Sequence, residues 1–87
     1  MMNLQSKSIS IIGMGYVGLP LATALSHHYN VHGFDINKKR IDELKNYYDK
    51  TKELTVGELK KSKVKYTNQI KHIKNSNIYI VTVPTPV

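Results

Sequence analysis

Apolar residues in the first third of the chain occur first as a short run and then at helical spacing. The run over 8–12 contains β-branched residues and stops at Gly13, as is typical of a strand buried on both faces of a parallel sheet. From Tyr16 onward, apolar residues recur at intervals of three and four positions, which predicts a helix. A second apolar run over 31–35 ends in an acidic residue and predicts a second strand.

The same alternation of strand and helix continues through the second half. Asn37 is a suitable N-cap for a helix with one apolar face. The segment Thr55-Val56-Gly57-Glu58 matches a capping box, which predicts another short helix over 56–61. Strands are predicted over 64–67 and 78–83, with a short helical turn between them. The predicted order of elements is therefore β-α-β-α-β-α-β.

This order predicts an α/β fold built on a parallel sheet. Each crossover is long enough for parallel pairing, and right-handed crossovers place the strands in the order 3-2-1-4 with helices on both faces. We classify the fold as a partial Rossmann fold, because a doubly wound sheet normally continues to about six strands. We expect 1–87 to be the N-terminal portion of one truncated domain. Its fourth strand is then an open edge, available to pair with a second copy of the chain in a homo-oligomer.

Glycines between the first strand and the first helix indicate a phosphate site. They form the pattern G-x-G-x-x-G, and Asp35 follows Gly13 by 22 residues at the end of the second strand. The first glycine permits a tight turn, the second lets pyrophosphate approach the backbone, and the third lets the helix pack closely. The alternative is a purely structural turn, but the strand-turn-helix context favours dinucleotide binding. The candidate cofactor-binding residues of the turn are Gly13, Met14, Gly15, Tyr16, Val17 and Gly18.

Asp35 distinguishes between the two common dinucleotides. Its carboxylate is placed to accept hydrogen bonds from the adenosine ribose and would repel the 2′-phosphate of NADP, so the sequence favours NAD. The alternative role for Asp35 is to help cap the next helix. Lys38, Lys39 and Arg40 follow closely and offer cations to a 2′-phosphate, so NADP stays open.

The end of the fourth strand is expected beside the same ligand. Strands 1 and 4 are predicted neighbours whose crossovers leave on opposite faces, so their carboxyl ends frame the crevice in which such folds bind ligands. Thr82 or Thr85 would offer a hydroxyl there, and Pro84 and Pro86 would stiffen the backbone. The alternative is a strand that simply ends in a prolyl loop.

Composition excludes several other functions. The 87 residues, 40% of them hydrophobic, suffice for one small folded domain. The chain has no cysteine, which excludes disulfides, thiolate metal sites and a cysteine nucleophile, and its histidines lack ligand spacing. The apolar stretches are too short and interrupted for a signal peptide or a membrane span. We therefore expect no metal, no membrane partner and a cytoplasmic location.

Positive charge is concentrated in the second half. The net charge is +7, and 38–74 holds twelve Lys and Arg against five Asp and Glu. Such a half offers cations to nucleic-acid phosphates, but both signs are interleaved on predicted helices, which is more typical of a solvated face. We expect no nucleic-acid partner. Binding to mixed DNA that weakens steeply with salt and does not respond to NAD would favour the alternative.

Segments in each part of the chain resemble one known family. They read I-G-M-G-Y-V-G-L-P-L-A from Ile12, G-F-D-I-N from Gly33, and V-T-V-P-T-P from Val81. In this order they are similar to the opening of the UDP-glucose/GDP-mannose dehydrogenase family. The V-P-T-P form and the stretch Asp49-x-Thr51-x-Glu53 look more like the UDP-N-acetylhexosamine branch than the UDP-glucose branch.

The resemblance implies an enzyme of polysaccharide biosynthesis. Such an enzyme uses NAD to oxidise the C6 alcohol of a UDP-sugar to a carboxylate in two steps, so the full-length protein would bind a nucleotide sugar. The resemblance also implies that Asp35 accepts the ribose and that Arg40 lies beside the adenosine. The segment that it places along the cofactor comprises Val81, Thr82, Val83, Pro84 and Thr85.

The family's catalytic cysteine would come from beyond residue 87. A covalent thiohemiacetal cannot form on a chain without cysteine, so the fragment alone is expected to be inactive and to bind NAD weakly or not at all. The alternative function is a non-catalytic module that senses a dinucleotide through the same turn and switches a partner.

Overall fold

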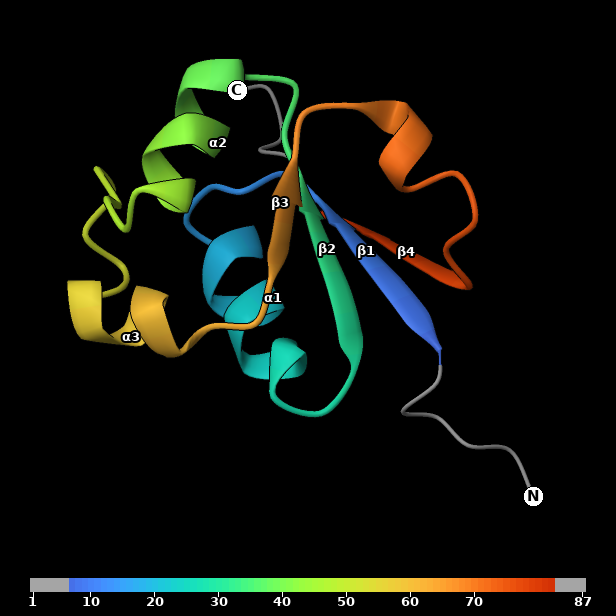
Figure 1. Ribbon diagram of the computed structural model, residues 1–87, viewed down its shortest axis with the longest axis horizontal. Coiled ribbons are helices and arrows are strands. Elements are labelled where there is room, and N and C mark those ends of the chain that lie inside the picture. Colours follow the sequence, from blue (N-terminus) through green and yellow to red (C-terminus); the bar gives the residue numbers. More distant parts are fainter. Residues whose placement is uncertain (1–6, 83–87) are drawn as a thin grey trace.

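The computed structural model describes residues 7–82, which form a parallel sheet with helices packed against it (Figure 1). The sheet has four strands in the order β3-β2-β1-β4, which confirms the predicted fold class and strand order. The strands are β1 (Ser8–Ile12), β2 (Asn30–Phe34), β3 (Lys65–Thr67) and β4 (Ile78–Val81). Each neighbouring pair is parallel, so the carboxyl ends of all strands meet near the top of the sheet in Figure 1.

The helices lie close to their predicted positions, although the first begins at Gly18, the last residue of the glycine turn, rather than at Tyr16. They are α1 (Gly18–Ser26), α2 (Lys38–Lys45), α3 (Val56–Lys61) and the 3-10 helix η2 (Ile70–His72). The Asn37 side chain accepts a hydrogen bond from the backbone N–H of Arg40. Thr55 and Glu58 make both hydrogen bonds of a capping box. Both predicted helix starts in the second half are therefore confirmed.

One face of the sheet carries the hydrophobic core. Ile9 and Ile11 alternate with Ser10 along β1, and Ile9 pairs with Val31 of β2, so these apolar side chains point to the same face. They share one buried cluster with residues of all the α-helices, namely Leu19, Ala22, Ile41, Leu44 and Leu59. The α-helices therefore cover this face, and their packing fixes the positions of α1 and α2 against the ends of the strands.

The opposite face is covered in the described residues by the segment that contains η2. The hydroxyl of Ser10 is hydrogen-bonded to that of Ser76, and Ile73 in the same segment is buried. The Tyr79 hydroxyl donates to the carbonyl of Lys74 at 2.9 Å. Val81 at the end of β4 stays 66% exposed. As expected, β4 is an open edge within the part of the chain that the structure describes.

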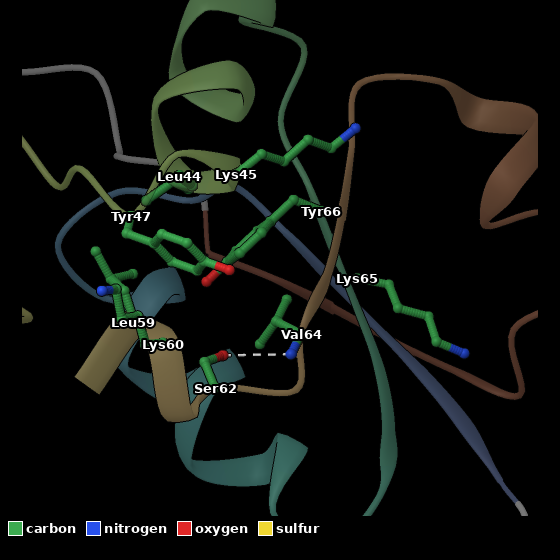
Figure 2. Close-up of a pocket in the computed structure, with 9 residues that line it drawn as sticks. All are labelled: Leu44, Lys45, Tyr47, Leu59, Lys60, Ser62, Val64, Lys65 and Tyr66. Atoms are coloured by element: carbon green, nitrogen blue, oxygen red, sulfur yellow. Dashed lines mark hydrogen bonds between the residues drawn. The ribbon is translucent and has the colours of Figure 1, made fainter. Parts of the chain in front are cut away.

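Helix α2 ends in a left-handed residue that is not glycine. Tyr47 has a φ of 63°, and its N–H donates to the carbonyl of Leu44 at 3.0 Å, while the N–H of Tyr48 donates to Glu43 at 2.9 Å. These two bonds form a Schellman motif, in which glycine is the usual left-handed residue. The Tyr47 ring lies in a hollow of about 350 Å³ between α2, α3 and β3, with the Lys60 ammonium 5.7 Å from the ring centre (Figure 2).

The free-energy cost of the positive φ at Tyr47 can be measured by substitution. Tyr47→Gly and Tyr47→Ala remove the same ring, but only glycine adopts a positive φ without steric strain. We expect the glycine variant to be more stable than the alanine variant by about 1 kcal/mol, although glycine is normally the less stable of the two by a similar amount. Urea unfolding of both variants checks this. A more stable alanine variant would show that Tyr47 is not strained.

Candidate functional site

The glycine turn joins the carboxyl end of β1 to the start of α1. Gly13 has a φ of 103°, a conformation that favours glycine, and its N–H donates to the carbonyl of Phe34 at 2.7 Å. The hydroxyl of Thr82, which follows β4, donates to the carbonyls of Ile12 and Gly13 at 3.0 and 2.9 Å. The turn is therefore held from β2 on one side and from β4 on the other.

The other two glycines of the motif have opposite surroundings. A Cβ on Gly18 would lie 1.7 Å from the carbonyl oxygen of Gly13 and 2.4 Å from the hydroxyl oxygen of Thr82. A Cβ on Gly15 would meet nothing within 4 Å. Gly18 is thus required for close packing of helix on strand, whereas Gly15 borders open space at the N-terminus of α1. This open space suits an anion, because the positive end of the helix dipole lies at a helix N-terminus.

Asp35 joins this turn to the start of α2. One of its carboxylate oxygens accepts a hydrogen bond from the N–H of Met14 at 2.9 Å, and the other accepts one from the N–H of Asn37 at 2.9 Å. The acid therefore supports the start of the helix, as the capping alternative predicted, although the N-cap itself is Asn37. A carboxylate has about four lone-pair directions, so it retains capacity to accept hydrogen bonds from a ligand.

A hollow of about 250 Å³ lies between the turn and Asp35, and we call it the Asp35 hollow. It is lined by Met14, Gly15, Tyr16, Asp35, Asn37, Arg40, Lys50 and Thr51. Three of these, Asn37, Lys50 and Thr51, were not among the site residues predicted from the sequence. The sequence did carry a signal for the last two, because they fall within the stretch Asp49-x-Thr51-x-Glu53.

Arg40 is buried beside this hollow, with only 4% of the residue exposed. Its Nε donates to the carbonyl of Met14 at 2.7 Å, and its Nη1 donates to Asp49 at 2.9 Å. Its Nη2 has no hydrogen-bond partner among residues 7–82. The prediction that the charged residues of this half lie on a solvated face is therefore wrong for Arg40 and Asp49, whose side chains pair in the interior. The pair of Lys38 and Asp42 is exposed, as expected.

Asp49 is held by several hydrogen bonds at once. Besides Arg40, it accepts hydrogen bonds from the backbone N–H groups of Thr51, Glu53 and Leu54 at 2.9 to 3.0 Å. Burial by itself raises the pKa of Asp49, but the hydrogen bonds from Thr51, Leu54 and Arg40 outweigh this effect and lower the pKa to about 2. The carboxylate is therefore charged throughout the physiological range.

The remaining predicted site residues differ in how they relate to the turn. The Met14 side chain is fully buried in the core, so only its backbone faces the site, while Tyr16 and Val17 are 67% and 66% exposed. Val81 is exposed at the end of β4, next to Thr82. The predictions for Val83, Pro84 and Thr85 lie outside the described residues.

Other kinds of site are not found in the described part of the chain. Residues 7–82 contain no group of three or more His, Cys, Asp or Glu side chains with the geometry to hold a metal ion. Among the same residues, none of the helices has the length and apolar character that crossing a membrane requires.

Comparison with known proteins agrees with this geometry. The model of the NAD-binding domain of the UDP-glucose/GDP-mannose dehydrogenase family matches residues 7–87. The chain belongs to the UDP-glucose/GDP-mannose dehydrogenase family. Its predicted cofactor, NAD, is confirmed by the domain that matches.

Individual relatives support the same assignment. The chain is 50% identical to the UDP-N-acetyl-D-glucosamine 6-dehydrogenase of Salmonella typhi, and the match covers 100% of this chain and 21% of the relative. It is 44% identical to protein CapL of Staphylococcus aureus, over 94% of this chain and 19% of the relative. The solved UDP-D-ManNAc dehydrogenase of Pyrococcus horikoshii superposes with a TM-score of 0.82 at 30% identity, over 92% of this chain and 21% of that structure. This family member thus spans about a fifth of the length of its relatives.

The described residues fit a dinucleotide. Space is open at Gly15, the glycine that the motif predicts will let a pyrophosphate approach the backbone. Asp35 lines the adjoining hollow and retains acceptor capacity, and the unpaired Nη2 of Arg40 lies beside it as a buried donor.

The pH dependence of unfolding tests the contribution of Asp49, the acid of the buried pair with Arg40, to the stability of the chain. Because the pKa of Asp49 is lower in the folded chain than its ordinary value of 3.8, its stabilising contribution is present at neutral pH and is lost as the pH falls toward 2. We expect Asp49→Asn to lower the free energy of unfolding by about 2 kcal/mol at neutral pH, and this difference to shrink between about pH 5 and pH 2.

Urea titrations at several pH values measure the difference. Asp42→Asn is the matched control, because its exposed pair with Lys38 is worth at most about 1 kcal/mol. A loss of stability for Asp49→Asn that stays constant across this pH range would contradict the lowered pKa.

Proposed function

We propose that this chain is the cofactor-binding part of an NAD-dependent nucleotide-sugar 6-dehydrogenase, and that it holds the pyrophosphate at the turn over 13–18. The observation that carries the proposal is the contrast between Gly18, which has no room for a side chain, and Gly15, which faces open space at the start of α1. Within the first turn of α1, the N–H of Leu19 already donates to the carbonyl of Gly15, and Pro20 has no N–H. The donors proposed for the anion are therefore N–H groups of the turn that precede Leu19.

The adenosine end of NAD is proposed to occupy the Asp35 hollow. The Asp35 carboxylate would accept hydrogen bonds from the ribose hydroxyls while it keeps its bonds to Met14 and Asn37. Arg40, which also lines this hollow, would lie beside the adenosine, as the family resemblance implied. These contacts would orient the cofactor from one end.

The nicotinamide end is proposed to follow the segment over 81–85, which begins at the last residue of β4. Thr82 supports this direction, because its hydroxyl already ties the end of β4 to the turn through Gly13. When bound, NAD supplies the hydride acceptor for oxidation of the sugar alcohol. The contribution of this chain is to bind and orient that group.

The proposed substrate is a UDP-N-acetylhexosamine, whose C6 alcohol would be oxidised to a carboxylate. The support comes from the names of the relatives, which include a UDP-N-acetyl-D-glucosamine dehydrogenase and a UDP-N-acetyl-D-mannosamine dehydrogenase, and from the stretch Asp49-x-Thr51-x-Glu53. Because the chain has no cysteine, we expect no turnover from it alone.

Cellular context forms part of the same proposal. We place the parent enzyme in polysaccharide biosynthesis in the cytoplasm, as a homo-oligomer, with residues 1–87 as the first portion of its NAD-binding domain. The support is the family resemblance and the open edge of β4.

The Gly15 site can be tested without loss of the fold. Gly15→Val adds a side chain to open space, so we expect unchanged thermal stability, while NAD affinity falls by about tenfold or more because the pyrophosphate loses its approach to the backbone. Isothermal titration calorimetry or NMR titration with NAD measures the affinity.

The control for this experiment is Gly18→Ala, which introduces an overlap with Gly13 and should lower stability as well as affinity. Equal NAD affinity in wild type and Gly15→Val would exclude the turn as the pyrophosphate site.

The role of Asp35 predicts a change in cofactor preference. Asp35→Asn removes the charge that repels a 2′-phosphate, so NADP affinity should rise relative to NAD affinity by about fivefold or more. Asp42→Asn removes the same charge from the exposed surface of α2 and should leave the ratio unchanged. The measurement is parallel titration with NAD and NADP. If both variants gave the wild-type ratio, Asp35 would not contact the ribose.

A further inference from the structure

We propose that Asp49 is a positioning residue for the cofactor. It fixes Arg40 against the glycine turn, and it also fixes the loop that brings Lys50 and Thr51 to the Asp35 hollow. The inference rests on the proposed NAD-binding function and extends it to a part of the chain that follows α2.

The first part of the argument is the path from Asp49 to the turn. Asp49 binds Nη1 of Arg40 at 2.9 Å, and Nε of the same guanidinium binds the Met14 carbonyl at 2.7 Å. The N–H of Met14 is held at 2.9 Å by Asp35. Both backbone polar groups of Met14 are therefore engaged, and one of them depends on how Arg40 is placed. Since Met14 immediately precedes Gly15, the orientation of this residue sets the backbone that would meet the pyrophosphate.

The second part is the loop itself. The carboxylate of Asp49 accepts the N–H groups of Thr51, Glu53 and Leu54, so the chain curls around a single buried charge. Lys52, at the tip of this curl, has a φ of 59°. Such a loop has no helix or strand of its own to hold it, and Asp49 supplies its anchor. Without that anchor, Lys50 and Thr51 would not have fixed positions beside the hollow.

The third part is the positive charge of Lys50, which the loop places beside the hollow. Arg40 and Lys50 line the same hollow as Asp35. Since Arg40 is already paired with Asp49, Lys50 adds a further cation beside the place proposed for the ribose. Asp35 opposes a 2′-phosphate, and Lys50 favours one. We therefore assign Lys50 as the residue that limits discrimination against NADP, provided that Asp49 holds the loop in place.

The dependence of Lys50 on Asp49 separates positioning from a general effect on stability. In wild type, Lys50→Ala should raise the ratio of NAD affinity to NADP affinity by about threefold or more. In an Asp49→Asn background, the same substitution should have almost no effect on this ratio, because the loop is no longer fixed. A residue that matters only for stability would leave the effect of Lys50→Ala unchanged.

The experiment is a set of NMR titrations of the 87-residue chain with NAD and NADP, a method that detects weak binding. Asp49→Asn should weaken NAD binding by about fivefold or more and shift the amide signal of Gly15 even without ligand. Glu53→Gln is the matched control, because it removes a charge from the same loop, and it should resemble wild type. Arg40→Lys keeps the charge but cannot hold Met14 and Asp49 with a planar fork, so it should reproduce the weaker binding even if Asp49→Asn fails to fold.

The possible failures are distinguishable. If neither the 87-residue chain nor the full-length protein that contains it shows saturable shifts with NAD, the proposed function fails, and this inference fails with it. If only the full-length protein binds NAD, the same variants are compared in that protein. If wild type binds NAD but Asp49→Asn and Arg40→Lys bind it equally well, only the positioning role is overturned. An undiminished effect of Lys50→Ala in the Asp49→Asn background would also overturn it.

Discussion

The close contact between the start of α1 and the end of β1 is the constraint on which the rest of this structure depends. At Gly18 even a methyl group would overlap the carbonyl of Gly13 and the hydroxyl of Thr82, so a helix and two strands meet there without spare volume. The same contact fixes where α1 begins, and the open space at Gly15 lies next to this helix N-terminus. The packing of the fold and the geometry of the proposed anion site thus both depend on one turn.

The turn is also rigid before any ligand arrives. The side chain of Met14 is buried in the core, and its N–H and carbonyl are bound by Asp35 and Arg40. Because these bonds are already made in the free chain, a ligand would not have to order the backbone on binding, which is the general advantage of a preorganised site. Asp49 extends this preorganisation, since it neutralises Arg40 in the interior. Removing one partner of such a buried pair is usually costly.

The two faces of the sheet contribute differently to this arrangement. The face that carries Ile9 and Ile11 holds the helices and the buried cluster, so the helices that border the site rest on firm packing. The opposite face is covered by the segment around η2, and β4 remains exposed at Val81. Within residues 7–82, the end of the proposed cofactor site at β4 therefore has less packing behind it than the end at Asp35.

The sequence by itself determined the order of strands and helices, the strand order of the sheet, the helix caps at Asn37 and Thr55, and the glycine turn. These features follow from local rules: periodicity, side-chain capping, right-handed crossovers and the steric needs of glycine act over a few residues or one crossover. The resemblance to one family pointed to NAD for a similar reason, because each of its three segments is a short contiguous stretch of the sequence.

Only the tertiary structure decided the surroundings of Arg40 and Asp49. Both are charged residues in a basic, polar stretch, and no periodic pattern distinguishes a buried pair from a solvated one. Their pairing depends on how the loop after α2 folds back on the turn, which also places Lys50 and Thr51 in the Asp35 hollow. The sequence did not predict the left-handed backbone conformation of Tyr47 either. This conformation results from the Schellman hydrogen bonds and the packing around the residue, not from the intrinsic conformational preference of tyrosine.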